Sequence, residues 1–225
     1  MPTPDPQPSA PPPADVPPPV WPGRLDAGEV EVLGETVAWE NPVARLLDSH
    51  VRYPARGANG EPTDSHSYRL TPGADQEEGV VVAAVDEADG RLLLVRQFRH
   101  PVRRWMTECP RGGRNQGETP EQAAARELRE ETGAEATAFA PLGRVAPDSG
   151  QLSTVTWLVA ARVRRAGGPH PEATEAIDRV VRMPYGALRA ACERGEVFDA
   201  FTLAAVLRLA PYARGDTLDL PWLPG

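Results

Sequence analysis

The segment from Gly112 to Ala134, GGRNQGETPEQAAARELREETGA, constrains the fold of this chain more than any other. Its middle predicts a short helix whose two ends are both specified by the sequence. Thr119-Pro120-Glu121-Gln122 has the pattern of a capping box, with proline at the first helical position. Gly133 supplies the left-handed residue that commonly ends a helix. We therefore expect a loop, a capped helix and a second loop in direct succession.

Three acidic residues share one side of this predicted helix. Glu130 lies three positions after Glu127, and Glu131 lies four after it, spacings that place side chains in one sector of a helix. Their mutual repulsion calls for a cation or a basic partner nearby. A cluster of carboxylate oxygens suits Mg²⁺ or Mn²⁺ rather than zinc. The alternative is an ordinary solvated helix face, and the residues around the acids favour the metal site.

These surrounding residues form a fixed pattern. Gly112 is followed by five residues, Glu118, seven residues and the run RELREETGA at 126–134. This order and spacing resemble the signature box of the Nudix hydrolases. Only Ala134 differs, being smaller than the bulky aliphatic residue usual there. The resemblance implies an α+β fold of the α/β/α sandwich type, with a mixed sheet between helices.

The resemblance also implies roles for the box residues. Glu127, Glu130 and Glu131 are expected to bind the divalent cations and to be catalytic. The backbone carbonyl of Arg111, where relatives often have alanine, is expected to join them on a metal. The structural residues of the box are expected to be Gly112, Glu118, Arg126 and Gly133. An outer contact to a metal is an alternative role for Glu118.

Motifs outside the box resemble the ADP-ribose pyrophosphatase branch of the family. They are QFR at 97–99, WMTECPRGG at 105–113 and ERGEVFDAFTL at 193–203. The resemblance implies hydrolysis of the pyrophosphate of a nucleoside diphosphate sugar, with ADP-ribose giving AMP and ribose 5-phosphate. Ser149 stands where ADP-ribose hydrolases usually have proline, so GDP-mannose and UDP-glucose stay open as substrates. A non-catalytic sensor of nucleotide sugars is a further alternative, which the intact box disfavours.

Other residues are candidates for contacts with the substrate and the attacking water. Arg99 is the expected ligand of a phosphate or ribose, and Glu108 the expected polar group that orients the substrate. Trp39 and Phe98 are candidates for stacking on adenine. Glu175 lies before a predicted strand, where relatives often have the acid that orients or deprotonates water. A surface acid without a role is the alternative for Glu175.

The composition excludes several classes of partner. A net charge of −8 argues against nucleic acid as the main ligand. No apolar run approaches a membrane span, and the proline-rich N-terminus lacks the features of a signal peptide. The two cysteines form neither a disulfide framework nor a zinc pattern, which fits free thiols in a reducing cytoplasm. The sequence therefore predicts a cytoplasmic enzyme acting on a small molecule.

The order of elements supports the layered fold. Strands are predicted at 29–33, 35–39, 49–53, 67–70, 79–85, 92–98, 138–145, 152–164 and 177–183, with helices at 185–194 and 200–210. Strands, a helix, more strands and closing helices favour a layered α+β domain over a doubly wound fold. The expected organisation is a proline-rich disordered tail at 1–27, a β-strand arm at 28–75, the hydrolase domain at 76–212 and a C-terminal tail at 213–225.

The arm at 28–75 predicts an assembly. Members of the branch commonly have N-terminal strands that cross to the partner subunit of a homodimer, so a homodimer is expected here. The alternative is a small sheet that folds back on its own subunit.

Overall fold

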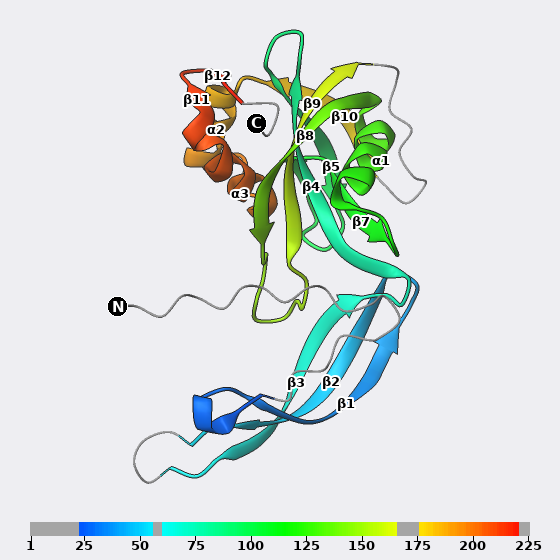
Figure 1. Cartoon of the computed structure of the whole chain (residues 1–225), viewed down its shortest axis with the longest axis vertical. Coiled ribbons are helices and arrows are strands. Elements are labelled where there is room, and N and C mark those ends of the chain that lie inside the picture. The colour runs from blue at the N-terminus through cyan, green and yellow to red at the C-terminus, as the bar shows by residue number, and fades with distance from the viewer. Residues whose placement is uncertain (1–22, 56–59, 166–175, 221–225) are drawn as a thin grey trace, which may run out of the picture. The chain divides into compact units, whose positions relative to one another are not determined.

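The computed structural model of the chain describes residues 23–55, 60–165 and 176–220 (Figure 1). The chain divides into two compact units. One consists of Met1–Val37 and Leu47–Tyr68, and the other of Ala38–Leu46 and Arg69–Gly225. The elements of the predicted hydrolase domain all lie in the second unit.

The N-terminal strands form a three-stranded sheet in the order β1-β2-β3. The strands are β1 (Glu31–Glu40), β2 (Ala44–Tyr53) and β3 (Thr63–Pro72). The prediction of two separate strands at 29–33 and 35–39 is wrong, because β1 continues through Gly34. A side chain at Gly34 would meet no atom within 4 Å, so nothing at this position interrupts the strand.

The main sheet has seven strands, with the path β10-β5-β4-β9-β8, β6 paired to β5 and β7 paired to β4. The strands are β4 (Gln76–Asp86), β5 (Leu92–Arg99), β6 (Arg104–Glu108), β7 (Arg111–Asn115), β8 (Ala134–Val145), β9 (Thr156–Arg165) and β10 (Ile177–Met183). The pair β4–β9 is parallel and the other pairs are antiparallel, so the sheet is mixed as predicted.

Helices cover both faces of this sheet. They are α1 (Pro120–Thr132), α2 (Tyr185–Glu193) and α3 (Ala200–Leu209). In Figure 1, α1 lies on one side of the sheet, and α2 and α3 lie on the other. The predicted α/β/α sandwich is therefore confirmed. The remaining described elements are the 3-10 turns η1 (Leu25–Ala27) and η2 (Ala210–Tyr212) and the short strands β11 (Ala213–Arg214) and β12 (Thr217–Leu218).

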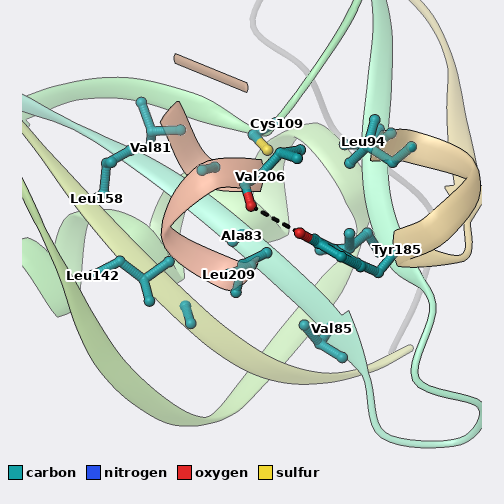
Figure 2. Close-up of a cluster of buried hydrophobic side chains, with 14 of the residues drawn as sticks. Val81, Ala83, Val85, Leu94, Cys109, Leu142, Leu158, Tyr185, Val206 and Leu209 are labelled. Atoms are coloured by element: carbon teal, nitrogen blue, oxygen red, sulfur yellow. Dashed lines mark hydrogen bonds between the residues drawn. The ribbon is translucent and has the colours of Figure 1, made fainter. Parts of the chain in front are cut away.

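Strand β4 is the centre of the core. Val81, Ala83 and Val85 face the cluster beneath α2 and α3 (Figure 2), whereas the alternate residues face the cluster beneath α1. A strand buried on both faces needs a continuous apolar run, which is what the sequence has at 79–85. On the α2 side, the Tyr185 hydroxyl donates to the Val206 carbonyl at 3.1 Å, so this buried phenol is satisfied.

Candidate active site

The helix of the signature box has the ends that its sequence predicts. The Thr119 side chain accepts a hydrogen bond from the Gln122 N–H at 3.2 Å, and the Gln122 side chain accepts one from the Thr119 N–H at 2.9 Å. Gly133 has φ 70° and its N–H donates to the Arg129 carbonyl. The caps set where α1 begins and ends, and the packing of Ala123, Ala124 and Leu128 in the core sets the direction of the acids.

The three acids of α1 expected to bind metal differ in burial. Glu131 is fully buried and Glu127 is 6% exposed, whereas the Glu130 side chain is 28% exposed. Glu131 accepts a hydrogen bond from the Arg111 N–H at 3.2 Å. Carboxylates are rarely this buried unless they are paired, so Glu127 and Glu131 do not belong to a solvated helix face.

Arg126 is the charge partner of the box acids. Its Nη1 donates to Glu127 at 2.7 Å and to Glu130 at 3.3 Å. Its Nε and Nη2 donate to the two carboxylate oxygens of Glu118 at 3.1 and 3.0 Å, and Nη2 also donates to the Gly113 carbonyl at 2.7 Å. These bonds hold the pKa of Glu118 down at about 2. Arg126 therefore bridges Glu118 and the helix carboxylates.

The acids have the chemistry and the space for a hard divalent cation. Oxygens of Glu127 and Glu130 already converge on one positively charged atom, Nη1 of Arg126. A Cβ at Gly112 would overlap the Glu127 carboxylate, so the glycine leaves the room that this carboxylate occupies. Among residues 23–55, 60–165 and 176–220, no group of three or more Asp, Glu, His or Cys side chains is arranged so that it could hold a metal ion. The fit therefore rests on the carboxylate donors and on the glycine that makes room for one of them.

A second group of charges lies beside the acids. Glu108 is fully buried, and its oxygens contact Nε of Arg99 at 2.6 Å and Nη2 of Arg111 at 2.8 Å. Burial raises the pKa of Glu108, and the two arginines oppose that rise. Nη1 of Arg111 also contacts Asp199 at 3.0 Å. The structure thus brings together two residues expected to contact substrate, Arg99 and Glu108, with Arg111 at the entry to the box.

The two aromatic candidates lie elsewhere on the sheets. Phe98 packs edge-on against Trp105, with ring centroids 5.6 Å apart. Trp39 lies on β1 with 52% of its surface exposed. Neither lines the cavities beside the box glycines. Their stacking on adenine stays a prediction.

Two cavities adjoin the box. One, of about 210 Å³, is lined by Gly112, Gly113, Arg126, Glu127 and neighbouring residues. The other, of about 340 Å³, shares the two glycines and extends to Leu70 and Leu152. The loop that contains Ser149 is hydrogen-bonded to Leu70 near the end of β3. The Leu70 N–H donates to the Gln151 carbonyl at 2.8 Å, and the Ser153 N–H donates to the Leu70 carbonyl at 3.0 Å. The loop bearing the atypical serine therefore reaches a wall of this second cavity.

Asp199 and Thr202 are site residues that the sequence analysis missed. Asp199 caps α3 by accepting from the Thr202 N–H at 2.9 Å and the Thr202 hydroxyl at 2.8 Å. The Thr202 hydroxyl in turn accepts from the Cys109 N–H at 2.9 Å. An aspartate three residues before a threonine is a recognisable helix start, so a signal for the cap was present. Its contact with Arg111 had no local signal.

Glu175, the expected base, lies outside the described residues, so its role stays a prediction.

Both cysteines are free, as predicted, and burial raises the pKa of Cys109 to about 12. In the described part of the chain, no helix is long and apolar enough to cross a membrane.

Comparison with known proteins identifies several relatives. The NUDIX domain model matches residues 75–203. An ADP-ribose pyrophosphatase of Mycobacterium tuberculosis is 31% identical over 151 residues, which cover 64% of this chain and 72% of the relative. An ADP-ribose pyrophosphatase of Bacillus subtilis is 49% identical over 53 residues, covering 24% of this chain and 28% of the relative. A mouse ADP-sugar pyrophosphatase is 36% identical over 83 residues, covering 36% and 38%.

The fold also has a counterpart among solved structures. A protein described as an ADP compounds hydrolase superposes with a TM-score of 0.62 at 19% identity, covering 81% of this chain and 93% of that chain. At this identity the similarity establishes the fold.

Proposed function

Because the chain belongs to the NUDIX family of pyrophosphohydrolases, we propose that it hydrolyses the pyrophosphate of a nucleoside diphosphate sugar in a metal-dependent reaction. The proposed substrate is ADP-ribose, and the products are AMP and ribose 5-phosphate. The observation that supports this most is the pair of buried carboxylates, Glu127 and Glu131, on a helix capped at both ends, with Glu127 lining a cavity beside Gly112.

Nudix enzymes generally use divalent metal ions, and Mg²⁺ or Mn²⁺ is the proposed cofactor here. Glu127, Glu130, Glu131 and the backbone carbonyl of Arg111 are the proposed ligands. When bound, such ions neutralise phosphate oxygens and lower the pKa of the attacking water. Arg126 holds Glu127 and Glu130 in position before the ion arrives.

The rest of the site has the groups that the substrate requires. Arg99 is proposed to donate to a phosphate or ribose oxygen, while Glu108, bonded to its Nε, fixes the direction of the guanidinium. Phe98 and Trp39 are the proposed aromatic contacts of the adenine. Glu175 is the proposed base that orients or deprotonates water. This assignment rests on the family resemblance and on the position of Glu175 before β10.

A homodimer formed through the arm at 28–75 is the proposed assembly. Strand β1 supports this because it exposes Leu33, Val37 and Trp39 at alternating positions, and Val37 and Trp39 are each 52% exposed. Exposed apolar side chains along one strand favour a partner surface. Light scattering of the full chain tests the proposal: a dimer mass supports the arm exchange, and a monomer supports a sheet that folds back on its own subunit.

The identity of the sugar nucleotide is tested by a substrate panel. ADP-ribose, GDP-mannose and UDP-glucose are each incubated with the full chain and Mg²⁺, and released phosphomonoester is measured after phosphatase treatment. ADP-ribose is expected to give the highest kcat/KM. A preference for GDP-mannose or UDP-glucose would change the proposed substrate but not the proposed pyrophosphate hydrolysis. Binding without turnover of any member would favour the nucleotide-sugar sensor.

A further inference from the structure

Arg111 makes more charged contacts than its place in the signature segment requires. Its guanidinium lies between two carboxylates, with Nη2 at 2.8 Å from Glu108 and Nη1 at 3.0 Å from Asp199. The same group lies 4.6 Å above the centre of the Phe201 ring. The Arg111 side chain is only 19% exposed, so these contacts form in a partly dry environment where they are stronger than at the surface.

The backbone of the same residue contacts the box helix. The Arg111 N–H donates to the Glu131 carboxylate at 3.2 Å. One residue therefore joins three elements: β6 through Glu108, the start of α3 through Asp199, and α1 through Glu131. The side chain that contacts Glu108 and Asp199 and the peptide N–H that contacts Glu131 thus belong to the same residue.

The two carboxylates that contact the Arg111 guanidinium, those of Glu108 and Asp199, each accept further hydrogen bonds on their other oxygen. The second oxygen of Glu108 accepts from Arg99 at 2.6 Å. The second oxygen of Asp199 accepts from the backbone and hydroxyl of Thr202. A buried carboxylate that loses one of its charge partners is strongly destabilised and rearranges. Loss of the Arg111 guanidinium would thus shift the Glu108 carboxylate and weaken its hydrogen bond with Arg99.

We infer that the side chain of Arg111 is a positioning residue that couples the metal-binding carboxylate Glu131 to the substrate-binding guanidinium of Arg99. The coupling runs from Glu131 through the Arg111 backbone to its guanidinium, and from there through Glu108 to Arg99. This inference rests on the proposed function only for its turnover readout. Asp199 fixes the other end of the guanidinium, which places the start of α3 in the same unit as the active site.

Lysine cannot replace arginine in this geometry. Its ammonium group is a single point charge, whereas the planar guanidinium reaches two carboxylates at once and stacks on an aromatic ring. Arg111→Lys is therefore expected to keep the charge and the fold but not the bridge. Asp199→Asn preserves a helix cap, because asparagine is also a favoured cap, while it removes the charge that faces Arg111.

Arg182 offers a matched control. It also bridges two carboxylates, with Nη2 at 2.7 Å from the buried Asp86 and 2.9 Å from Asp89. That bridge joins β10 to the hairpin after β4 and includes none of the box residues. Arg182→Ala therefore removes an ion pair with a buried carboxylate, and it reports the general cost to stability without a change at the acids.

The test is a calorimetric titration of Mn²⁺ into the folded full chain, with KM and kcat measured on the same variants. Arg111→Ala and Arg111→Lys are expected to weaken Mn²⁺ binding by about 10–100-fold, the usual cost of removing a residue that orients a metal ligand. KM for the sugar nucleotide should rise as well. Arg182→Ala should bind Mn²⁺ like the wild type. When either Arg111 substitution is combined with Asp199→Asn, the loss of Mn²⁺ affinity should be smaller than the sum of the losses in the two single variants.

The outcomes separate this inference from the proposed function. Wild-type affinity for Mn²⁺ in folded Arg111→Lys and Asp199→Asn would overturn the inference, as would equal losses in Arg182→Ala. If the wild type binds Mn²⁺ but hydrolyses no sugar nucleotide, the proposed function fails, while the Mn²⁺ titrations still decide the role of Arg111. A wild type without Mn²⁺ binding would overturn both.

Discussion

Arg126 and Glu118 form a two-bond ion pair across the box, with Nε to one carboxylate oxygen at 3.1 Å and Nη2 to the other at 3.0 Å. The paired geometry fixes direction as well as distance. Since Nη2 also donates to the Gly113 carbonyl, both the loop before α1 and strand β7 are held to the helix. Glu118 thus acts on the site by holding the loop, and Arg126 by holding both the loop and the helix acids.

Acid pH should weaken this bridge in a defined window. The pKa of Glu118 is about 2, below its ordinary value of 4.5, because Arg126 stabilises the charged form. A lowered pKa means that the stabilisation is complete above about pH 4.5 and is lost as the pH falls through about 2. Glu118→Gln should therefore be less stable than wild type at neutral pH, and the difference should narrow below pH 4.5, as measured by denaturant unfolding.

Glu121→Gln is the control for this experiment, since Glu121 is an exposed acid in the first turn of the same helix. Its stability should differ little from wild type across the same pH range. A stability difference for Glu118→Gln that stayed constant down to about pH 3 would contradict the assigned ion pair.

A side chain at Gly112 should disrupt the acids directly. The Cβ of Gly112→Ala would overlap the Glu127 carboxylate and force it away from its position. The displaced atoms are the far end of a flexible side chain, so the carboxylate can move at a small cost in stability. We expect little change in thermal stability together with weaker Mn²⁺ binding. Gly34→Ala is the control, because a Cβ there meets no atom within 4 Å. Unchanged Mn²⁺ affinity in Gly112→Ala would show that the Glu127 carboxylate is not a ligand.

The Cys109 thiol should not react with thiol reagents in the folded protein. Its thiol is buried at 2% exposure, and burial raises its pKa to about 12, so almost no thiolate exists at neutral pH. In a Cys192→Ser variant, a thiol reagent should label the protein only after denaturation. Labelling at the rate of a free thiol under native conditions would mean that the packing around β6 and α3 is wrong.

Local signals explain which parts of the fold could be predicted from sequence. The caps of α1 depend on Thr119, Gln122 and Gly133, which lie within the helix or next to it, and all three act as expected. The buried strand β4 was visible as an apolar run. Strands β6 and β7 were not predicted, because RWMTE and RGGRN are short and mostly polar and depend on pairing with β5 and β4.

Long-range contacts explain what the sequence left out of the site. The acids of the box lie within one segment, so their spacing and the resemblance to the signature box indicated them. Arg111 and Asp199 are 88 positions apart, and only the packing of α3 against the sheet brings them together. No pattern of residue types near either one predicts such a pair.

The most direct test of the account is release of AMP from ADP-ribose by the full chain in Mg²⁺, in EDTA, and with Glu131→Gln in place of the wild type. We predict AMP release that requires Mg²⁺, stops in EDTA and falls by about 10²–10⁴-fold in the variant. Release that persists at the wild-type rate in EDTA and in Glu131→Gln would contradict the central claim that this helix holds the catalytic metal, and no release by the wild type would contradict ADP-ribose as the substrate.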